Sequence, residues 1–105
     1  MIESNFQRRL KKEIKERFPD CYVLKTDPND IQGMPDLLIL YKDKWAALEV
    51  KKSKDASRRP NQTYHVERLN DMSYSAFIFP ENKKEVLDEL AETFGVERTA
   101  CVVQS

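Results

Sequence analysis

The chain has 105 residues, which suits one compact domain, and it is 40% hydrophobic and 34% charged. It contains no run of about 18 apolar residues, and its first residues lack the apolar stretch of a signal peptide, so the sequence predicts neither a membrane-spanning helix nor secretion. Cys21 and Cys101 lie far apart and near no pair of histidines, which predicts free thiols rather than a zinc site. We expect a cytoplasmic protein.

The net charge is zero, with 18 basic and 18 acidic side chains, but the charges are distributed unevenly. Residues 1–68 carry 15 Lys and Arg against 11 Asp and Glu, whereas residues 69–105 carry 3 against 7. The basic excess lies in the part of the chain that holds the candidate site described below. A positive face is expected of a surface that binds phosphate groups.

In chain order, the first predicted element is an amphipathic helix at 2–18. Its apolar residues recur at every fourth position and form one narrow stripe; they are Ile2, Phe6, Leu10, Ile14 and Phe18. Further apolar runs and turn residues predict strands at 21–26, 37–41 and 45–50, a helix at 61–70, a strand at 75–79, a helix at 83–94 and a short strand at 101–103. The continuous apolar runs favour strands that are covered on both faces, as in an α/β domain.

The strands at 37–41 and 45–50 are expected to form a hairpin. If its turn is centred between Lys42 and Asp43, Asp36 faces Glu49 across the pair. Directly opposed side chains lie about 4.5–5.5 Å apart on one face of a sheet. Lys51 follows Glu49 by two positions and therefore points to the same face. The sequence thus predicts that two carboxylates and one ammonium group converge.

Two opposed carboxylates repel each other unless a cation binds between them. Mg²⁺ commonly takes one or two carboxylates, together with waters and substrate phosphate oxygens. A lysine beside such a cation can orient a water for attack on phosphorus and offset the charge that builds on the phosphate. An Asp followed by Glu-x-Lys also occurs by chance on protein surfaces, but here the acids end two apolar strands, which favours phosphodiester hydrolysis.

These residues resemble the PD-(D/E)XK nuclease superfamily, with Pro35-Asp36 as its PD and Glu49-Val50-Lys51 as its (D/E)XK. The chain is most similar to the small VRR-NUC type and to archaeal and phage nucleases that resemble Holliday-junction resolvases. Three stretches carry this closer match: Lys25 upstream of Gly33-Met34-Pro35-Asp36, the triplet Glu49-Val50-Lys51, and Arg59-Pro60-Asn61-Gln62. The resemblance covers roughly residues 1–94. It implies an α/β fold with an α-β-β-β-α-β core of the restriction-endonuclease kind, a mixed central sheet flanked by helices, and one nuclease domain over 1–105.

The resemblance also implies roles for individual residues. Asp36 and Glu49 would bind Mg²⁺ or Mn²⁺ together with the Val50 carbonyl, and Lys51 would be the catalytic lysine. Gln62 corresponds to a glutamine that faces the site, although a polar residue at a helix start also often serves as a cap. Glu3 corresponds to a first-helix acid that assists the metal, although a glutamate there also simply suits the helix dipole.

Five basic residues are candidates for contact with nucleic acid because they adjoin the predicted site; they are Lys25, Lys52, Lys54, Arg58 and Arg59. Each is also compatible with a solvated surface charge. His65 has no partner histidine, and Trp45 lacks the spacing of a base-stacking platform, so we expect structural roles for both.

By resemblance, the expected activity is a metal-dependent DNA endonuclease of a bacterium or a phage-infected host, acting in recombination or repair. Branched DNA such as a Holliday junction is the expected substrate, a homodimer the expected assembly, and 5′-phosphate and 3′-hydroxyl ends the expected products. No small-molecule cofactor is expected. Two alternatives stay open: a non-catalytic member that binds nucleic acid or protein, and a general DNA-nicking or restriction nuclease.

Overall fold

The computed structural model describes residues 3–96, and within them every predicted element is present. The order is α1 (Glu3–Arg17), β1 (Tyr22–Lys25), β2 (Leu37–Tyr41), β3 (Lys44–Val50), α2 (Pro60–Met72), β4 (Ser75–Ile78), the short 3-10 helix η1 (Pro80–Asn82) and α3 (Lys83–Phe94). Each predicted boundary lies within two residues of the observed one. The predicted strand at 101–103, which includes Cys101, lies outside the described residues.

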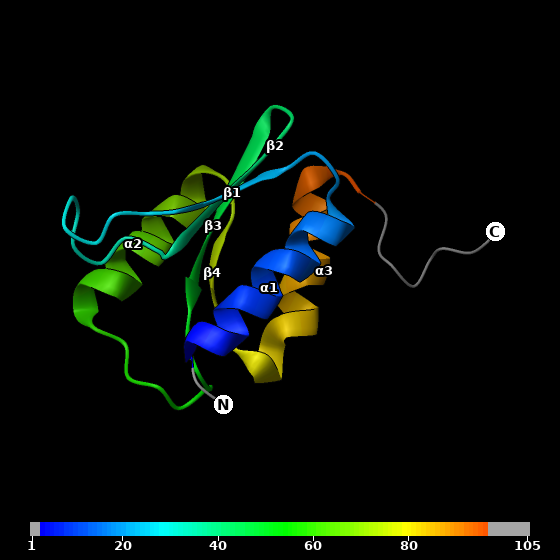
Figure 1. The fold of residues 1–105 in the computed structure, drawn as a ribbon. Coiled ribbons are helices and arrows are strands. Elements are labelled where there is room, and N and C mark those ends of the chain that lie inside the picture. The colour runs from blue at the N-terminus through cyan, green and yellow to red at the C-terminus, as the bar shows by residue number, and fades with distance from the viewer. Residues whose placement is uncertain (1–2, 97–105) are drawn as a thin grey trace.

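The four strands form one mixed sheet in the order β1-β2-β3-β4. The first three are antiparallel neighbours, and β4 lies parallel to β3. A parallel pair cannot be joined by a tight turn, so the chain crosses over through α2 between β3 and β4 (Figure 1). This confirms the predicted α/β class and the mixed sheet.

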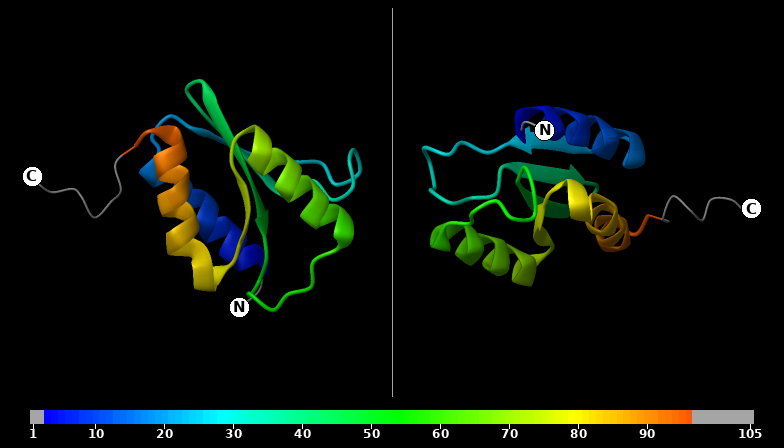
Figure 2. Two further views of the ribbon diagram at one scale, coloured as in Figure 1. Left: turned by 180° about the vertical axis from the view of Figure 1, so that it is seen from behind. Right: turned by 90° about the horizontal axis from the view of Figure 1, so that it is seen from below.

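The helices cover the two faces of the sheet unequally. Both α1 and α3 lie on one face, and α2 lies on the other (Figures 1 and 2). The stripe of α1 is buried at Phe6, Leu10, Ile14 and Phe18, as its four-residue spacing predicts. The Phe18 ring packs edge-on against Phe94 of α3, with centroids 5.2 Å apart. None of the helices within residues 3–96 is long and apolar enough to cross a membrane.

The prediction that the strands are covered on both faces is correct for β3, whose last five residues are all buried, and largely for β4, whose residues are buried or half-buried. On the α2 face, Tyr22 and Leu24 of β1 are 67% and 43% exposed, and Leu40 of β2 is 37% exposed. The reason is geometric: one helix is too narrow to cover four strands, and α2 packs on β3 and β4. The best-covered strand is therefore the one that carries Glu49.

Candidate active site

The hairpin of β2 and β3 has the predicted register, with Leu40 opposite Trp45 and Leu38 opposite Ala47. Its two-residue turn is tight, and Lys42 adopts a positive φ of 57°. Regular pairing starts at Leu37, one residue after Asp36. The Asp36 carboxylate instead accepts a hydrogen bond of 2.9 Å at Oδ2 from the backbone N–H of Val50. The side chain of Asp36 is thus attached to the end of β3.

The segment before Asp36 is held against β1 and α2. Thr26 donates its hydroxyl to the Pro35 carbonyl at 2.7 Å and its backbone N–H to the Asp36 carbonyl at 2.9 Å. Gly33 has a φ of 85°, and a Cβ there would lie 2.8 Å from the Asn61 side chain and 2.9 Å from its backbone. Only glycine meets both conditions without strain. Gly33 therefore allows close contact between this segment and the first turn of α2.

The buried residues Glu49 and Lys51 form a polar cluster with the half-buried Gln62. Glu49 is 4% and Lys51 9% exposed, and the Lys51 ammonium lies 3.7 Å from Glu49 Oε2. Gln62 joins the two: its Nε2 donates to Glu49 Oε2 at 3.1 Å, and its Oε1 accepts from Lys51 Nζ at 2.9 Å. A carboxylate and an ammonium group that are removed from water need such partners. The geometry therefore holds the lysine in one orientation.

Gln62 also caps the helix on which it lies. Its Oε1 accepts the backbone N–H of Arg59 at 3.0 Å, which satisfies one of the donors left open at the start of α2. Pro60 occupies the first turn, where its missing N–H costs nothing. The sequence left capping and a site-facing role as alternatives for Gln62. In the structure it makes both sets of contacts.

Burial raises the pKa of the Asp36 carboxyl above its ordinary value of 3.8. The Val50 N–H, then Lys51 and then Lys25 act in the opposite direction and favour the charged form of Asp36. The protein alone therefore offsets only part of the free-energy cost of burying the negative charge of Asp36. A cation bound beside this carboxylate would offset more of that cost.

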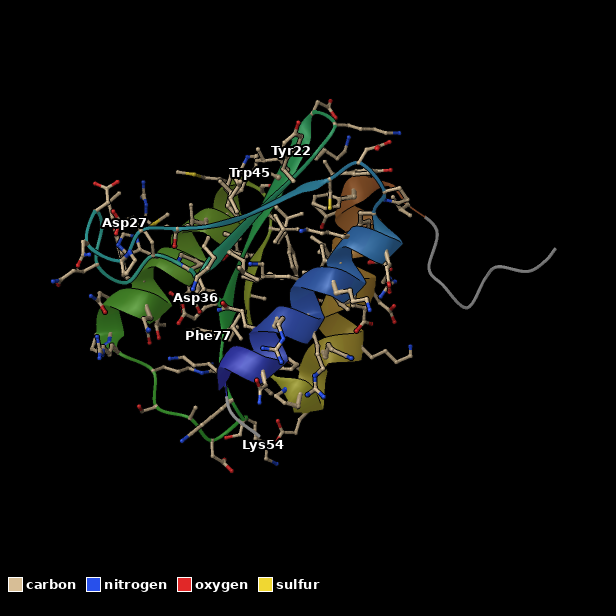
Figure 3. The ribbon with its side chains drawn as sticks, in the orientation of Figure 1. Tyr22, Asp27, Asp36, Trp45, Lys54 and Phe77 are labelled. Atoms are coloured by element: carbon tan, nitrogen blue, oxygen red, sulfur yellow. The ribbon has the colours of Figure 1, made fainter. Side chains whose placement is uncertain are left out.

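The five basic residues proposed for nucleic acid are all exposed. Lys25 lies at the end of β1, opposite Leu37. The other four lie in the segment between β3 and α2, and Lys54 is at its far bend, away from Asp36 (Figure 3). His65 packs edge-on against Tyr64 at 5.1 Å between centroids, in keeping with a structural role.

No protein-family model matches the chain, and a search of curated proteins finds no match. The solved structures that are similar to it include two VRR_NUC structures. One, described as a VRR_NUC domain protein, has a TM-score of 0.68 and 17% identity, and the match covers 91% of this chain and 90% of that one. The other, described as a VRR_NUC domain, has a TM-score of 0.57 and 32% identity over 81% of this chain and 92% of that one.

The chain belongs to the VRR_NUC domain family. The second match establishes membership, because it combines 32% identity with 92% coverage of that structure. The first has a lower identity and supports the fold alone. The resemblance to the VRR-NUC type and the fold class predicted from the sequence are both confirmed. The VRR_NUC fold is that of a nuclease family.

The donor atoms of this VRR_NUC site fit a hard divalent cation. Asp36 and Glu49 supply carboxylate oxygens, and one oxygen of Asp36 is anchored by the Val50 N–H. Within residues 3–96 there is no group of three or more His, Cys, Asp or Glu that could hold a metal. Two carboxylates with a backbone carbonyl, waters and phosphate oxygens still match the ligand number that Mg²⁺ commonly takes from a protein. Glu3 begins α1, but its side chain lies outside what the structure describes.

Two contacts near this site were not predicted from the sequence. Gly33 entered the sequence analysis only as part of the stretch Gly33-Met34-Pro35-Asp36, although a glycine three residues before Asp36 can also indicate a backbone requirement. Phe77 of β4 was interpreted only as part of a strand. It pairs with Glu49, and the Arg58 guanidinium lies 4.0 Å from its ring centre.

Replacement of Gly33 by alanine is expected to cost roughly 1–3 kcal/mol of stability, because a side chain is strained at positive φ, and to lower cleavage by up to about 100-fold. The added Cβ displaces Asn61 and with it the neighbouring Gln62 that orients Lys51. Chemical denaturation and single-turnover cleavage measure the two effects.

Gly95→Ala is the matched control. Gly95 has a φ of 75°, but a Cβ there meets nothing within 4 Å. It should share the backbone strain and keep full activity. Equal activity of the two variants at a temperature where both are folded would show that the contact with Asn61 does not position the site.

Proposed function

We propose that this protein is a metal-dependent DNA endonuclease. The observation that carries the proposal is the convergence of two acids, one lysine and one glutamine at the end of β3. Glu49, Lys51 and Gln62 are joined by side-chain hydrogen bonds, and Asp36 is attached to the same place through the backbone N–H of Val50. Glu49 lies in β3 and Lys51 directly follows that strand, whereas Asp36 and Gln62 reach the same place from a loop and from α2. Membership in the VRR_NUC family supports the same activity.

Asp36, Glu49 and the Val50 carbonyl would hold Mg²⁺, with Mn²⁺ as a substitute. When bound, the cation supplies Lewis acidity at a phosphate oxygen and makes a nearby water more acidic. Glu49 is already oriented by Gln62, and Asp36 by the Val50 N–H, so little reorganisation is required of these ligands. Protons compete with the cation for Asp36, because burial raises the pKa of this carboxyl.

Lys51 supplies the fixed positive charge of the reaction. Its ammonium is held by Gln62 at 2.9 Å and can direct a further N–H toward a water or a phosphate oxygen. The water oxygen forms a bond to phosphorus, and the bond from phosphorus to the 3′ oxygen breaks. The water loses a proton and the 3′ oxygen gains one, which leaves a 5′-phosphate and a 3′-hydroxyl. Lys51 offsets the negative charge that builds on the phosphate during this exchange.

DNA is the proposed substrate because exposed Lys and Arg side chains lie at the end of β1 and in the segment between β3 and α2, and both of these adjoin the site. Contacts of this kind go to phosphates, which position a protein on DNA but carry no base sequence. Selectivity for DNA shape, such as a four-way junction, is therefore proposed over selectivity for sequence. A homodimer would place two sites on one junction for paired incision, as the family resemblance implies.

Supercoiled plasmid and a synthetic four-way junction, each incubated with Mg²⁺, Mn²⁺ or a chelator, test the proposal. Metal-dependent cutting of either substrate supports the endonuclease. Paired incision across opposite strands of the junction supports junction resolution, whereas equal nicking of plasmid and junction favours a general nickase. If neither substrate is cut in any metal while the protein still binds DNA, a non-catalytic binding role replaces the proposal.

A further inference from the structure

The segment between β3 and α2 is attached to β4 by one arginine. The Arg58 guanidinium lies 4.0 Å from the ring centre of Phe77 and 5.9 Å from that of Phe79. Phe77 is half-buried and pairs with Glu49 across the parallel strands β3 and β4. Paired residues of neighbouring strands point to the same face of a sheet. Arg58 is therefore held on an aromatic surface that borders the Glu49 carboxylate.

The contact with Phe77 leaves the N–H groups of the Arg58 guanidinium available for hydrogen bonds. Within the part of the chain that the structure describes, Arg58 makes no hydrogen bond or ion pair with protein, and its contacts are with the two rings. An aromatic ring attracts the cation but uses none of its five N–H donors in a conventional hydrogen bond. A guanidinium in this state can bind the two oxygens of a phosphate at once.

We propose that Arg58 and Phe77 form a phosphate-binding subsite for a DNA backbone phosphate next to the one that is cleaved. The inference rests on the proposed endonuclease function. Phe77 orders the arginine before DNA arrives, so less side-chain entropy is lost on binding. Lys52 and Lys54 on the same segment are exposed. They contribute charge, whereas Arg58 contributes a positioned contact that aligns the DNA strand with Asp36 and Glu49.

The test measures DNA affinity by fluorescence anisotropy over a range of salt concentrations, with Ca²⁺ in place of Mg²⁺. Phe77→Leu keeps the arginine and removes its aromatic support, and Arg58→Lys keeps the charge and removes the planar group. Both should weaken binding on the order of three- to tenfold with an unchanged salt dependence. Arg58→Ala should weaken it at least as much and lower the salt slope by about 1.

Lys54→Ala is the matched control, because it removes one exposed cation of the same segment without removing a ring contact. Both its loss of affinity and its change in salt slope should be smaller than those of Arg58→Ala, because Lys54 lies at the far bend of the segment, away from Asp36. Melting temperatures show whether Phe77→Leu still folds; if it does not, Arg58→Lys, a surface change, decides.

Wild-type affinity in Arg58→Lys, or a loss in Arg58→Ala no larger than in Lys54→Ala, would overturn the subsite. If the wild-type protein binds no DNA, the proposed function fails and the subsite fails with it; if only the variants' losses are missing, the subsite alone fails.

Discussion

Replacement of Lys51 by methionine is expected to lower the cleavage rate on the order of 10²- to 10³-fold, with DNA affinity nearly unchanged. Methionine matches the length of lysine but brings no charge to the phosphate in the transition state. The substitution also removes an ammonium 3.7 Å from the buried Glu49, so the melting temperature should fall. Single-turnover cleavage at a temperature well below the transition measures the chemical effect.

Lys52→Met is the control for this prediction. Lys52 is the next residue along the chain and is exposed, so the same substitution removes an equal charge outside the buried cluster. It should change affinity and leave the single-turnover rate of bound DNA close to that of the wild type. If both variants cleave equally fast, Lys51 has no role in the chemical step.

Replacement of Asp36 by asparagine is expected to abolish cleavage and, unusually for a buried site, to raise the melting temperature of the metal-free protein at neutral pH. Asparagine can still accept the hydrogen bond from the Val50 N–H. It carries no charge, so the desolvation that raises the pKa of Asp36 no longer opposes folding. Loss of activity with a gain in stability is typical of a residue that is retained for function.

The pH dependence of this effect has a definite sign. Because the pKa of Asp36 is raised in the folded protein, protonated Asp36 favours folding. The contribution of Asp36 to the free energy of unfolding is fully present below the ordinary pKa of 3.8. It is lost as the pH rises through the pKa that Asp36 has in the folded protein. The difference in melting temperature between Asp36→Asn and the wild type should therefore grow across that window and remain constant above it.

Metal binding gives a readout that needs no cleavage. Mg²⁺ at about 100 times its dissociation constant should stabilise the wild type by about 2.7 kcal/mol and Asp36→Asn by much less. Asp43→Asn is the control. Asp43 is exposed in the turn of the same hairpin, so this variant should keep both the stabilisation by Mg²⁺ and the cleavage of DNA. If Mg²⁺ stabilised the wild type, Asp36→Asn and Asp43→Asn equally, Asp36 would not be a ligand of the metal.

The parts of the fold that depend on local spacing were predictable from the sequence. The four-residue stripe of α1 fixed its buried face, and the turn at Lys42 and Asp43 fixed the register of β2 and β3. A tight turn between adjacent strands allows very few registers, so the position of the turn predicts which residues of the two strands face each other. The convergence of Asp36 with the end of β3 followed from that register.

Contacts between segments far apart in the sequence were harder to predict. The spacing predicted that Asp36 would face Glu49, but the hydrogen bond to the Val50 N–H depends on the irregular chain at Pro35. The contact of Gly33 with Asn61 and that of Arg58 with Phe77 depend on how α2 and its connecting segment pack on the sheet. Periodicity reports which face of an element is buried, not which partner covers it. For the same reason, the exposed outer face of β1 and β2 was not foreseen.

Gln62 both caps α2 and holds Lys51, and these two roles determine how the protein would lose activity on warming. The amide that caps α2 is the one that orients Lys51, so fraying of the first turn of α2 and release of the lysine are a single event. Helix ends open locally at a free energy well below that of global unfolding. Catalytic competence would therefore be limited by this local opening equilibrium, and the site would become disordered while the core of α1, α3 and the sheet is still intact.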